Sequence, residues 1–193
     1  MINEILLKRR STVLFDTKSI EDAILESLFE AARWAPSSRN TQPWRFVYSV
    51  RGDEFHASMI ECLNSANRIW ASHAPVLLHT VAQVVSDYKD QENIYAWHDT
   101  AMAYSNLVYE ATDRGLYVHP MGGFDRDMAR SVLHIPERYE PVIFAALGYK
   151  SENPSKFSTE LIDREARQRV RKPINELLFY GRFGTEAGFK SKQ

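Results

Sequence analysis

The amino-acid sequence predicts a layered domain of the α/β or α+β class, in which strands and helices alternate along the chain. Three observations support this class: helical stripes of apolar residues, short β-branched or aromatic runs, and Gly- or Pro-containing turns between them. The chain has 193 residues, which is enough for one domain with a substantial core. We therefore expect a single domain spanning residues 1–193.

The first long helix is predicted over residues 20–35. Ser19 and Asp22 have the spacing of a capping box, and apolar residues then recur at every third or fourth position, as on the buried face of a helix. Pro36 ends this helix, because proline lacks the N–H that helical hydrogen bonding requires.

The remaining elements continue the alternation. Short apolar, β-branched or aromatic runs predict strands over residues 45–50, 76–82, 116–119 and 142–149. Helical spacing predicts helices over residues 55–63, 97–114 and 125–133. Gly115 stands where a left-handed residue closes the second of these helices. The last strand is continuously apolar, which is typical of a strand buried on both faces.

The segment from residue 151 to residue 193 differs from the rest of the chain. It begins with a polar stretch and a heavily charged stretch, and Leu177, Leu178 and Phe179 then provide apolar anchors. We expect this C-terminal extension to pack on another subunit.

Composition narrows the class of protein and ligand. The chain carries 24 Lys and Arg residues against 25 Asp and Glu, so its net charge of -1 gives no broad attraction to nucleic acid or to an anionic membrane. The N-terminus does not resemble a secretory signal, and no apolar run approaches the roughly 20 residues of a membrane-spanning helix. The single Cys62 has apolar neighbours, which indicates a packed thiol in a reducing compartment. The sequence therefore predicts a cytoplasmic protein.

Residues 8–12, with the sequence KRRST, form the first candidate site. The guanidinium groups of Arg9 and Arg10 and the hydroxyl of Ser11 suit a phosphate, because arginine binds phosphate oxygens through charge-assisted and often bidentate hydrogen bonds. The alternative is a solvated basic helix end, which the helix dipole also favours.

Residues 36–44, with the sequence PSSRNTQPW, form the second candidate site. Here a helix ends in a loop with two serine hydroxyls and two carboxamides between two prolines. Carboxamides present a donor and an acceptor together, so the loop suits the edge of a planar heterocycle with alternating N–H and C=O groups. The alternative is a polar turn in which Ser and Asn side chains bond the backbone.

Four segments occur along the chain in a characteristic order: RRSTVLF, AARWAPSSRNTQPWRF, PMGGFD after a long helix that ends in glycine, and PINELLFYGRFG after a basic segment. In this order, and most distinctively in PSSRNTQPW, the chain resembles the nitroreductase family of flavoproteins. The resemblance implies an α+β three-layer sandwich with a central, mainly antiparallel sheet flanked by helices. It also implies an interlocked homodimer with two FMN molecules at the subunit interface.

For the phosphate and ribityl end of FMN, the resemblance implies a set of residues from both ends of the chain. These are Arg9, Arg10 and Ser11, joined by Arg169 and Arg171. Several arginines that together neutralise a dianionic phosphate would explain why cations gather in two distant segments of a chain with balanced charge. Arg167 and Lys172 are alternatives within the second segment.

For the flavin ring, the resemblance first implies contacts from the PSSRNTQPW loop. Pro36, Ser37, Ser38 and Asn40 would reach the FMN that is bound mainly by the other subunit. Gln42 would support the loop or touch the ring.

Two further segments are implied beside the ring. Asn67 would place its amide against the flavin, and the alternative is an exposed cap at a helix end. Pro120, Met121, Gly122 and Gly123 would pass beside the isoalloxazine, where the two glycines let the backbone approach closely enough for an N–H to bond flavin N5. The alternative for this segment is a tight turn between a strand and a helix.

The activity implied by the resemblance is that of an NAD(P)H-dependent FMN oxidoreductase. In the implied ping-pong cycle, NAD(P)H delivers hydride to flavin N5, the nicotinamide leaves, and an electron-poor acceptor such as a nitro compound or a quinone takes its place. The flavin carries the redox chemistry, so no catalytic side chain is predicted. The six histidines show no spacing typical of a metal site, and no metal is expected. The alternatives are a specialised flavin enzyme for an endogenous metabolite, such as a dehalogenase or an enoyl-type reductase, and a non-catalytic flavin-binding protein.

Two positions depart from the family pattern. Val13 stands two positions after Ser11, where family members commonly carry Arg or Lys, and Trp70 stands where some relatives have Lys. With fewer cations near the pyrimidine edge, anionic reduced FMN is expected to be less stabilised. We therefore expect weaker nitro reduction or a specialised acceptor, with Arg39 and Arg45 as the candidate compensating cations.

Overall fold

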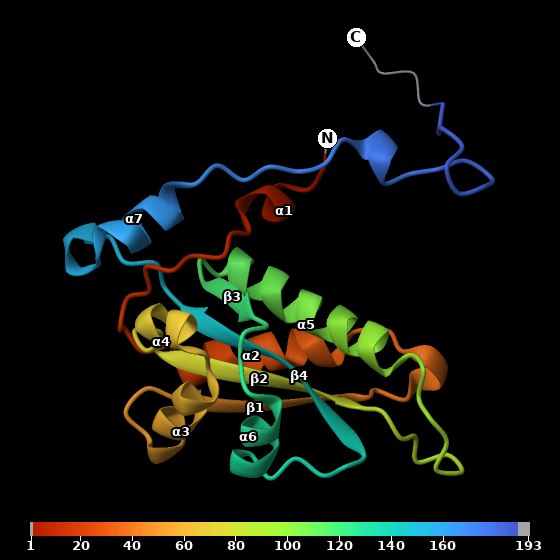
Figure 1. Ribbon diagram of the computed structural model, residues 1–193, viewed down its shortest axis with the longest axis horizontal. Helices are drawn as coiled ribbons and strands as arrows, with labels where there is room; N and C mark the ends of the chain where they lie inside the picture. The colour runs from red at the N-terminus through yellow and green to blue at the C-terminus, as the bar shows by residue number, and fades with distance from the viewer. Residues whose placement is uncertain (1, 189–193) are drawn as a thin grey trace.

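The computed structural model describes residues 2–188, which form a four-stranded antiparallel sheet covered by helices on both faces (Figure 1). The strands lie in the order β1, β2, β4, β3, and every neighbouring pair is antiparallel. Their bounds are Trp44–Val50 for β1, Val76–Gln83 for β2, Tyr117–Met121 for β3 and Tyr139–Gly148 for β4. The predicted α+β class with a central antiparallel sheet is therefore confirmed.

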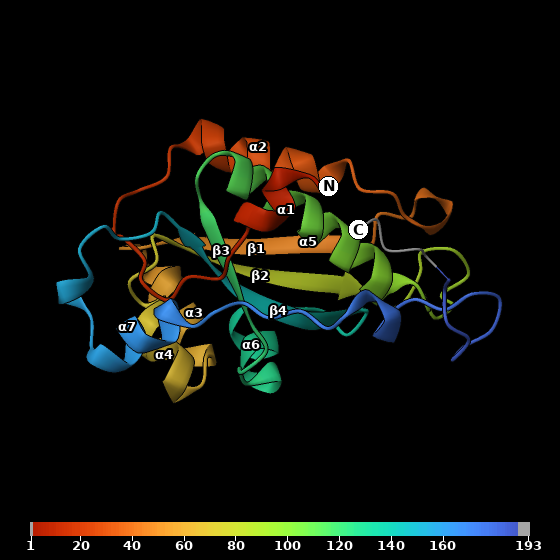
Figure 2. The same cartoon turned by 90° about the horizontal axis from the view of Figure 1, so that it is seen from above.

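One face of the sheet is covered by two long helices, α2 (Asp22–Arg33) and α5 (Ala96–Asp113), with the short α1 (Glu4–Lys8) packed against α5 (Figure 2). Ala32 on α2 and Ala103 on α5 are fully buried in this layer. Small side chains at a helix interface let the two backbones approach closely, so larger apolar residues on either side reach the sheet.

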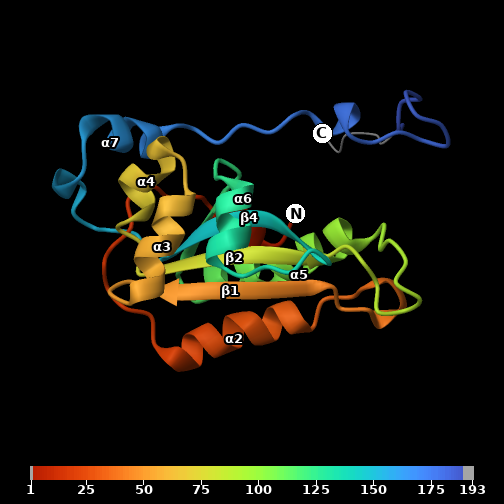
Figure 3. The ribbon, with the colours of Figure 1, turned by 60° about the horizontal axis from the view of Figure 1, so that its bottom comes forward.

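The opposite face carries three shorter helices, α3 (Glu54–Cys62), α4 (Ser65–Ala71) and α6 (Arg126–Val132) (Figure 3). They enclose a second core cluster that includes Val13, Trp70 and Phe144, each at most 1% exposed. α7 (Thr159–Ala166) contributes Leu161 to the same cluster. The N-terminal segment and α7 are thus joined to the domain through this second core.

The helix predicted over residues 20–35 is shorter than expected and begins differently. α2 starts after Glu21, whose backbone oxygen accepts the first helical hydrogen bonds and whose side chain makes no cap bond. The predicted capping box of Ser19 and Asp22 is therefore wrong, because Ser19 lies outside the helix. At the other end of the layer, Gly115 closes α5 with a φ of 75°, as predicted.

The C-terminal segment contains one helix and then an extended arm, residues 167–188. Figures 1 and 3 show the arm leaving α7 and running past the body of the domain. Large apolar side chains along it are exposed: Val170, Ile174, Leu177, Tyr180 and Phe183. Within the described residues, no helix has the length and apolar character needed to cross a membrane.

His79 on β2 is a fully buried imidazole in the second core. Its ring lies 5.4 Å from that of Phe124 and 4.2 Å from that of Phe144, centroid to centroid. Among residues 2–188, neither of its ring nitrogens has a hydrogen-bond partner. Burial, followed by the nearby guanidinium of Arg126, lowers the pKa of His79 from 6.5 to about 3. The folded protein therefore holds this imidazole neutral.

Replacing His79 by Phe should make the stability less sensitive to acid. Between the unfolded pKa near 6.5 and the folded value near 3, the unfolded chain binds a proton that the folded chain excludes, so the free energy of unfolding falls by about 1.4 kcal/mol per pH unit. Urea unfolding at pH 7 and pH 5 should show that the wild type loses about 2 kcal/mol more than His79→Phe. The exposed His134, changed to Asn, serves as control and should keep the wild-type loss. Equal losses in wild type and His79→Phe would contradict the assignment.

Candidate functional site

The two basic segments of the sequence meet in one small cavity of about 230 Å³, which we call the basic cavity. It is lined by Arg9, Arg10, Ser11, Arg164, Glu165, Arg167, Arg169 and Arg171. All five residues expected at a phosphate are thus brought together. Of the alternatives, Arg167 also lines the basic cavity, whereas Lys172 lies outside it and faces Glu176 at 4.0 Å.

Hydrogen bonds from arginine side chains join the two ends of the chain at the basic cavity. Arg169 donates through Nη1 to the backbone oxygen of Arg9 (2.5 Å) and through Nη2 to that of Leu7 (2.7 Å). These oxygens belong to the C-terminal end of α1, where helical carbonyls lack partners and favour cations. Arg10 donates in the reverse direction, to the backbone oxygens of Glu165 and Arg167 (both 3.2 Å).

The basic cavity has a strong excess of positive charge. Burial, and then the nearby Arg169 and Arg171, lower the pKa of Arg9. Among the described residues that line it, Glu165 is the only acid, and its carboxylate is already engaged by other partners. Arginines held this close repel one another, so a bound anion that accepted several charge-assisted hydrogen bonds would stabilise the arrangement. The donor set fits a phosphate.

Glu165 ties α7 to the N-terminal segment. Its Oε2 accepts hydrogen bonds from Thr12 Oγ1 (2.9 Å) and the backbone N–H of Val13 (3.0 Å), and its Oε1 lies 2.7 Å from Lys150 Nζ. Burial alone would raise the pKa of Glu165, but these hydrogen bonds, led by that from Lys150, hold it below its ordinary value. The ionised carboxylate therefore fixes the position of the arginines that follow it. Sequence reasoning missed this residue, because nothing in REARQRVRK distinguishes a buried acid from a solvated one.

The PSSRNTQPW loop forms a strained turn at the start of β1. Arg39, Asn40 and Gln42 all have positive φ values, of 52°, 55° and 47°. Non-glycine residues rarely adopt this conformation, which costs on the order of 1 kcal/mol each and tends to mark functional sites. Two predicted site residues use their side chains within the turn: Ser37 Oγ accepts the backbone N–H of Gln42 (3.0 Å), and Gln42 Nε2 donates to the backbone oxygen of Asn40 (3.3 Å).

Asp99, near the start of α5, holds this turn in place. It is 3% exposed, and its Oδ2 accepts the backbone N–H of Ser38 (2.8 Å) while its Oδ1 pairs with His98 Nδ1 (2.8 Å). Pro36 and Asn40 remain exposed, and Ser38 and Gln42 are half-buried. Figure 3 shows the turn at one end of β1 and α7 at the opposite end of the sheet. Within one chain, the predicted ring-binding loop and the basic cavity are therefore separate.

Asn67 and Gly123 lie together, as the resemblance implied. The amide Nδ2 of Asn67 donates to the backbone oxygen of Gly123 (3.1 Å), and the backbone N–H of Asn64 donates to the same oxygen (3.0 Å). The cap of α4 is Asn64, so the alternative of Asn67 as a helix cap is wrong. Pro120 and Met121 belong to β3, which places the turn at the two glycines.

The two glycines play different parts. A Cβ atom on Gly123 would lie 2.2 Å from Asn64 Nδ2 and 3.0 Å from Asn67 Nδ2, so the missing side chain makes room for these two amides. Gly122 faces open space, because no atom in the described part of the chain lies within 4 Å of the point that a Cβ would occupy there. A planar ring could therefore approach the backbone at Gly122. At Gly123 the corresponding space is filled by the amide side chains of Asn64 and Asn67.

His119 on β3 is a second residue that sequence reasoning missed. Its Nδ1 donates to the backbone oxygen of Thr12 (2.7 Å), and its ring stacks on Trp70 at 4.3 Å. Burial lowers the pKa of His119, so the imidazole is neutral with its proton on Nδ1. It joins β3 to the segment that leads out of the basic cavity. No spacing rule could reveal this contact, because it links residues from distant parts of the chain.

Comparison with known proteins gives consistent matches. The sequence profile of the Nitroreductase family matches residues 6–69 and 63–149. A solved oxidoreductase containing FMN is similar to this chain with a TM-score of 0.90 and 29% identity, covering 96% of this chain and 94% of that one. An NADH dehydrogenase of Thermus thermophilus is 27% identical over 176 residues, which cover 76% of this chain and 85% of that protein. A nitroreductase family protein from Streptococcus pneumoniae shares the fold, with a TM-score of 0.72 at 23% identity over 91% of this chain and 97% of its own.

Proposed function

The chain belongs to the nitroreductase family, and we propose that it is an FMN-dependent oxidoreductase that takes hydride from NAD(P)H and passes it to an electron-poor acceptor. The observation that carries this proposal is the basic cavity, in which arginines from both ends of the chain surround a space that suits a phosphate. The similar oxidoreductase contains FMN, and the similar Thermus protein is an NADH dehydrogenase. These names support FMN as cofactor and a nicotinamide as donor.

In the proposed site, Arg9, Arg10, Arg169 and Arg171 would hold the FMN phosphate, with Ser11 as a hydroxyl donor. When bound, FMN supplies the redox chemistry, because its N5 can accept hydride from a nicotinamide and return it to an acceptor. The protein then has to bind, orient and shield rather than act as a nucleophile. The neutral His119, on the segment next to the basic cavity, would keep that segment in position across neutral pH.

The ring-binding residues of the proposed site come from two subunits. The turn that carries Pro36, Ser37, Ser38 and Asn40 lies away from the basic cavity of its own chain, so it would contact the cofactor of a partner. Asn67 and the 120–123 segment would stand beside the ring in the same chain. The side-chain oxygen of Asn67 accepts no hydrogen bond from residues 2–188, which leaves it available to a ring N–H.

A specialised acceptor is the second candidate function, and Val13 and Trp70 favour it. Val13 is 1% exposed and Trp70 is 0% exposed, and both pack in the second core cluster. Trp70 stacks between Phe15 (6.1 Å) and His119 (4.3 Å), so it has become part of the core. The positions at which relatives place cations near the flavin are thus apolar here. Anionic reduced FMN would gain less stabilisation, which disfavours broad nitro reduction.

The arm of residues 167–188 would pack on a second copy of this chain, as part of a C-terminal extension that begins at residue 151. Its exposed apolar side chains need a covering surface, and a homodimer would also complete the divided ring site. Sedimentation equilibrium of the full chain should give the mass of two chains. A monomer at micromolar concentration would contradict both the packing of the arm and the shared site.

The purified protein should be yellow and should bleach on reduction. Anaerobic addition of NADH or NADPH should remove the flavin absorbance, and a nitro compound or quinone should restore it. Protein that stays colourless after incubation with FMN would rule out the proposed function. Protein that binds FMN without reduction by either nicotinamide would support the non-catalytic alternative.

Replacing Arg171 by Met should weaken FMN binding roughly 10- to 100-fold, because one charge-assisted hydrogen bond contributes about 1.5 to 3 kcal/mol. Arg171 suits this test, since it lines the basic cavity and its one side-chain hydrogen bond within residues 2–188 goes to the neighbouring Val170. The matched control is Lys172→Met, which removes the same charge one position outside the basic cavity. Fluorescence titration with FMN measures both variants, and equal affinities would show that Arg171 does not contact the phosphate.

A further inference from the structure

A larger cavity of about 550 Å³ lies at the start of α5. Of the residues that line it, only Ser38 is among those expected to contact the cofactor. We call it the aromatic cavity. It is lined by Ser38, Arg39, Thr41, Ser86, Tyr88, Gln91, Glu92, Asn93, Ile94 and Tyr95. A smaller, separate cavity of about 230 Å³ adjoins it and shares Thr41, Ser86, Tyr88 and Asn93 with it. The first wall is the strained turn before β1, and the second is the segment of residues 84–95.

The second wall is a hairpin rather than an irregular loop. Val85 and Glu92 form an antiparallel bridge, and Ser86 N–H donates to the backbone oxygen of Gln91 (2.8 Å). Lys89 and Asp90 at its tip have positive φ values of 57° and 48°, as tight hairpin turns require. The wall is thus held by its own backbone hydrogen bonds.

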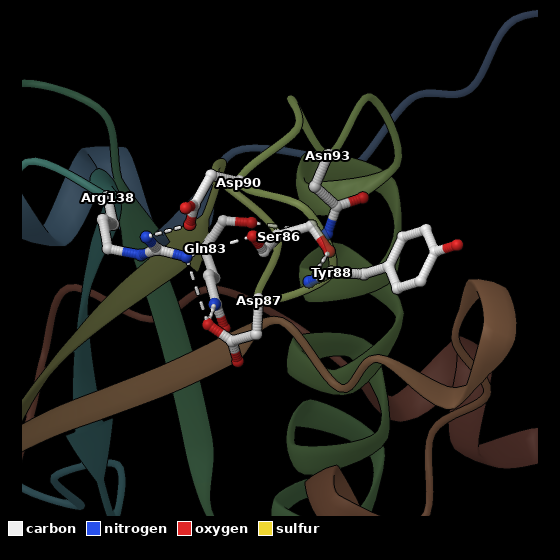
Figure 4. A network of polar contacts seen from close by, with 7 residues as sticks. All are labelled: Gln83, Ser86, Asp87, Tyr88, Asp90, Asn93 and Arg138. Carbon is white, nitrogen blue, oxygen red and sulfur yellow. Dashed lines mark hydrogen bonds and ion pairs between the residues drawn. The ribbon is translucent and has the colours of Figure 1, made fainter.

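Arg138 clamps this hairpin onto the end of β4, as Figure 4 shows. Its guanidinium donates to Asp90 Oδ1 (2.6 Å), Asp87 Oδ1 (3.2 Å) and the backbone oxygen of Ser86 (3.0 Å). Gln83 Nε2 adds a hydrogen bond to Asp87 Oδ1 (2.8 Å). Asp87 and Asp90, the two acids of the hairpin tip, are therefore both bonded to Arg138. Among the described residues that line the aromatic cavity, Glu92 is the one carboxylate.

The hairpin presents aromatic side chains at the aromatic cavity. Tyr88 is 61% exposed and Tyr95 is 50% exposed, and Ile94 beside them is 68% exposed. In Figure 4 the ring of Tyr88 points away from the Arg138 clamp. The Nζ of Lys89 lies 5.1 Å from the centroid of this ring, so a stacked ligand would use the ring face that Lys89 leaves open. Exposed aromatic faces at a cavity offer stacking surfaces for a planar ring.

Within the described part of the chain, Arg39 is the only cation that lines the aromatic cavity. The turn fixes its backbone in the left-handed conformation. The hydrogen bond from the backbone N–H of Ser38 to Asp99 holds that turn in place. Among residues 2–188, its guanidinium takes part in no ion pair and no hydrogen bond. An unpaired guanidinium carried on a constrained backbone, in a cavity that is also lined by tyrosines, suits a carboxylate carried on an aromatic ring.

We propose that the aromatic cavity binds planar aromatic monoanions, with Arg39 as the residue that binds the anionic group and the hairpin tyrosines as the stacking surface. Glu92 stands on the opposite wall and would repel a second acidic group, so a monoanion is preferred over a dianion. Binding of such a molecule follows from the aromatic cavity itself. Its role as the electron acceptor rests on the proposed function, because the same turn carries Ser38, which would reach the flavin.

Calorimetric titration of the full-length protein with benzoate and with benzamide tests the binding step. The two probes share a ring and differ in charge, so benzoate should bind roughly tenfold more tightly or better. Arg39→Gln should reduce this preference to about twofold or less. Lys156→Gln is the control, because it removes an exposed positive charge from residues 154–156, outside the aromatic cavity, and it should keep the preference. Equal binding of the two probes, or an unchanged preference in Arg39→Gln, would overturn the proposal.

The dianion terephthalate tests the part assigned to Glu92. It should bind more weakly than benzoate to the wild type, and Glu92→Gln should remove most of that difference. A difference that persists in Glu92→Gln would overturn the assigned polarity of the aromatic cavity.

Kinetics on the FMN-loaded protein separate this proposal from the proposed function. With NADH as donor, Arg39→Gln should raise the KM for 4-nitrobenzoate about tenfold relative to its effect on 4-nitrobenzamide. A loaded enzyme that turns over both acceptors with no such difference would overturn the acceptor role assigned to the aromatic cavity and leave the flavin function intact. A protein that binds no FMN would overturn the proposed function. The calorimetric comparison of benzoate with benzamide would still test the anion site, because it does not require bound flavin.

Discussion

A single buried carboxylate holds together the part of the molecule on which the basic cavity depends. Glu165 is bonded by Thr12 and Val13 from the N-terminal segment and by Lys150 from the end of β4. Removing such an acceptor would leave a buried hydroxyl and a buried N–H without partners, each costing about 1 to 3 kcal/mol. Because α7 is fixed in this way, the arginines that follow it lie over the end of α1. The proposed phosphate site in the basic cavity therefore depends on the carboxylate of Glu165.

The charge distribution of the chain follows the same logic. The sequence is nearly neutral overall, yet several arginines converge on one cavity, whereas ion pairs such as Lys8–Glu4 and Arg33–Glu30 lie exposed on helix surfaces. Exposed pairs contribute little to stability. A concentration of like charges in one cavity is unfavourable without a ligand, so it indicates that binding rather than folding determines their placement.

Rigidity is placed where a planar ligand would need it. The turn before β1 holds three non-glycine residues in the left-handed region, and Asp99 fixes it to the start of α5. The facing hairpin is fixed by Arg138, which engages both of its acidic tip residues. The aromatic cavity between them is bounded by two segments that are each held by hydrogen bonds. The first part of the arm of residues 167–188 is held in the same way, because Arg169 bonds the backbone of Arg9 and Leu7, whereas the apolar side chains further along it are exposed.

The sequence by itself determined the layered fold and the main elements, because apolar periodicity and Gly and Pro punctuation act over a few residues. The resemblance to the nitroreductase family implied the arginines of both basic segments and the amides of the PSSRNTQPW loop, and the fold brings those arginines to one cavity. Only the tertiary structure decided that Glu165 and His119 position the N-terminal segment, and that Val13 and Trp70 belong to the core. These roles arise from contacts between residues far apart in the chain, and no local pattern encodes which distant group a side chain will meet. The aromatic cavity beside Arg39 has the same origin, because its walls come from two segments that only the fold brings face to face.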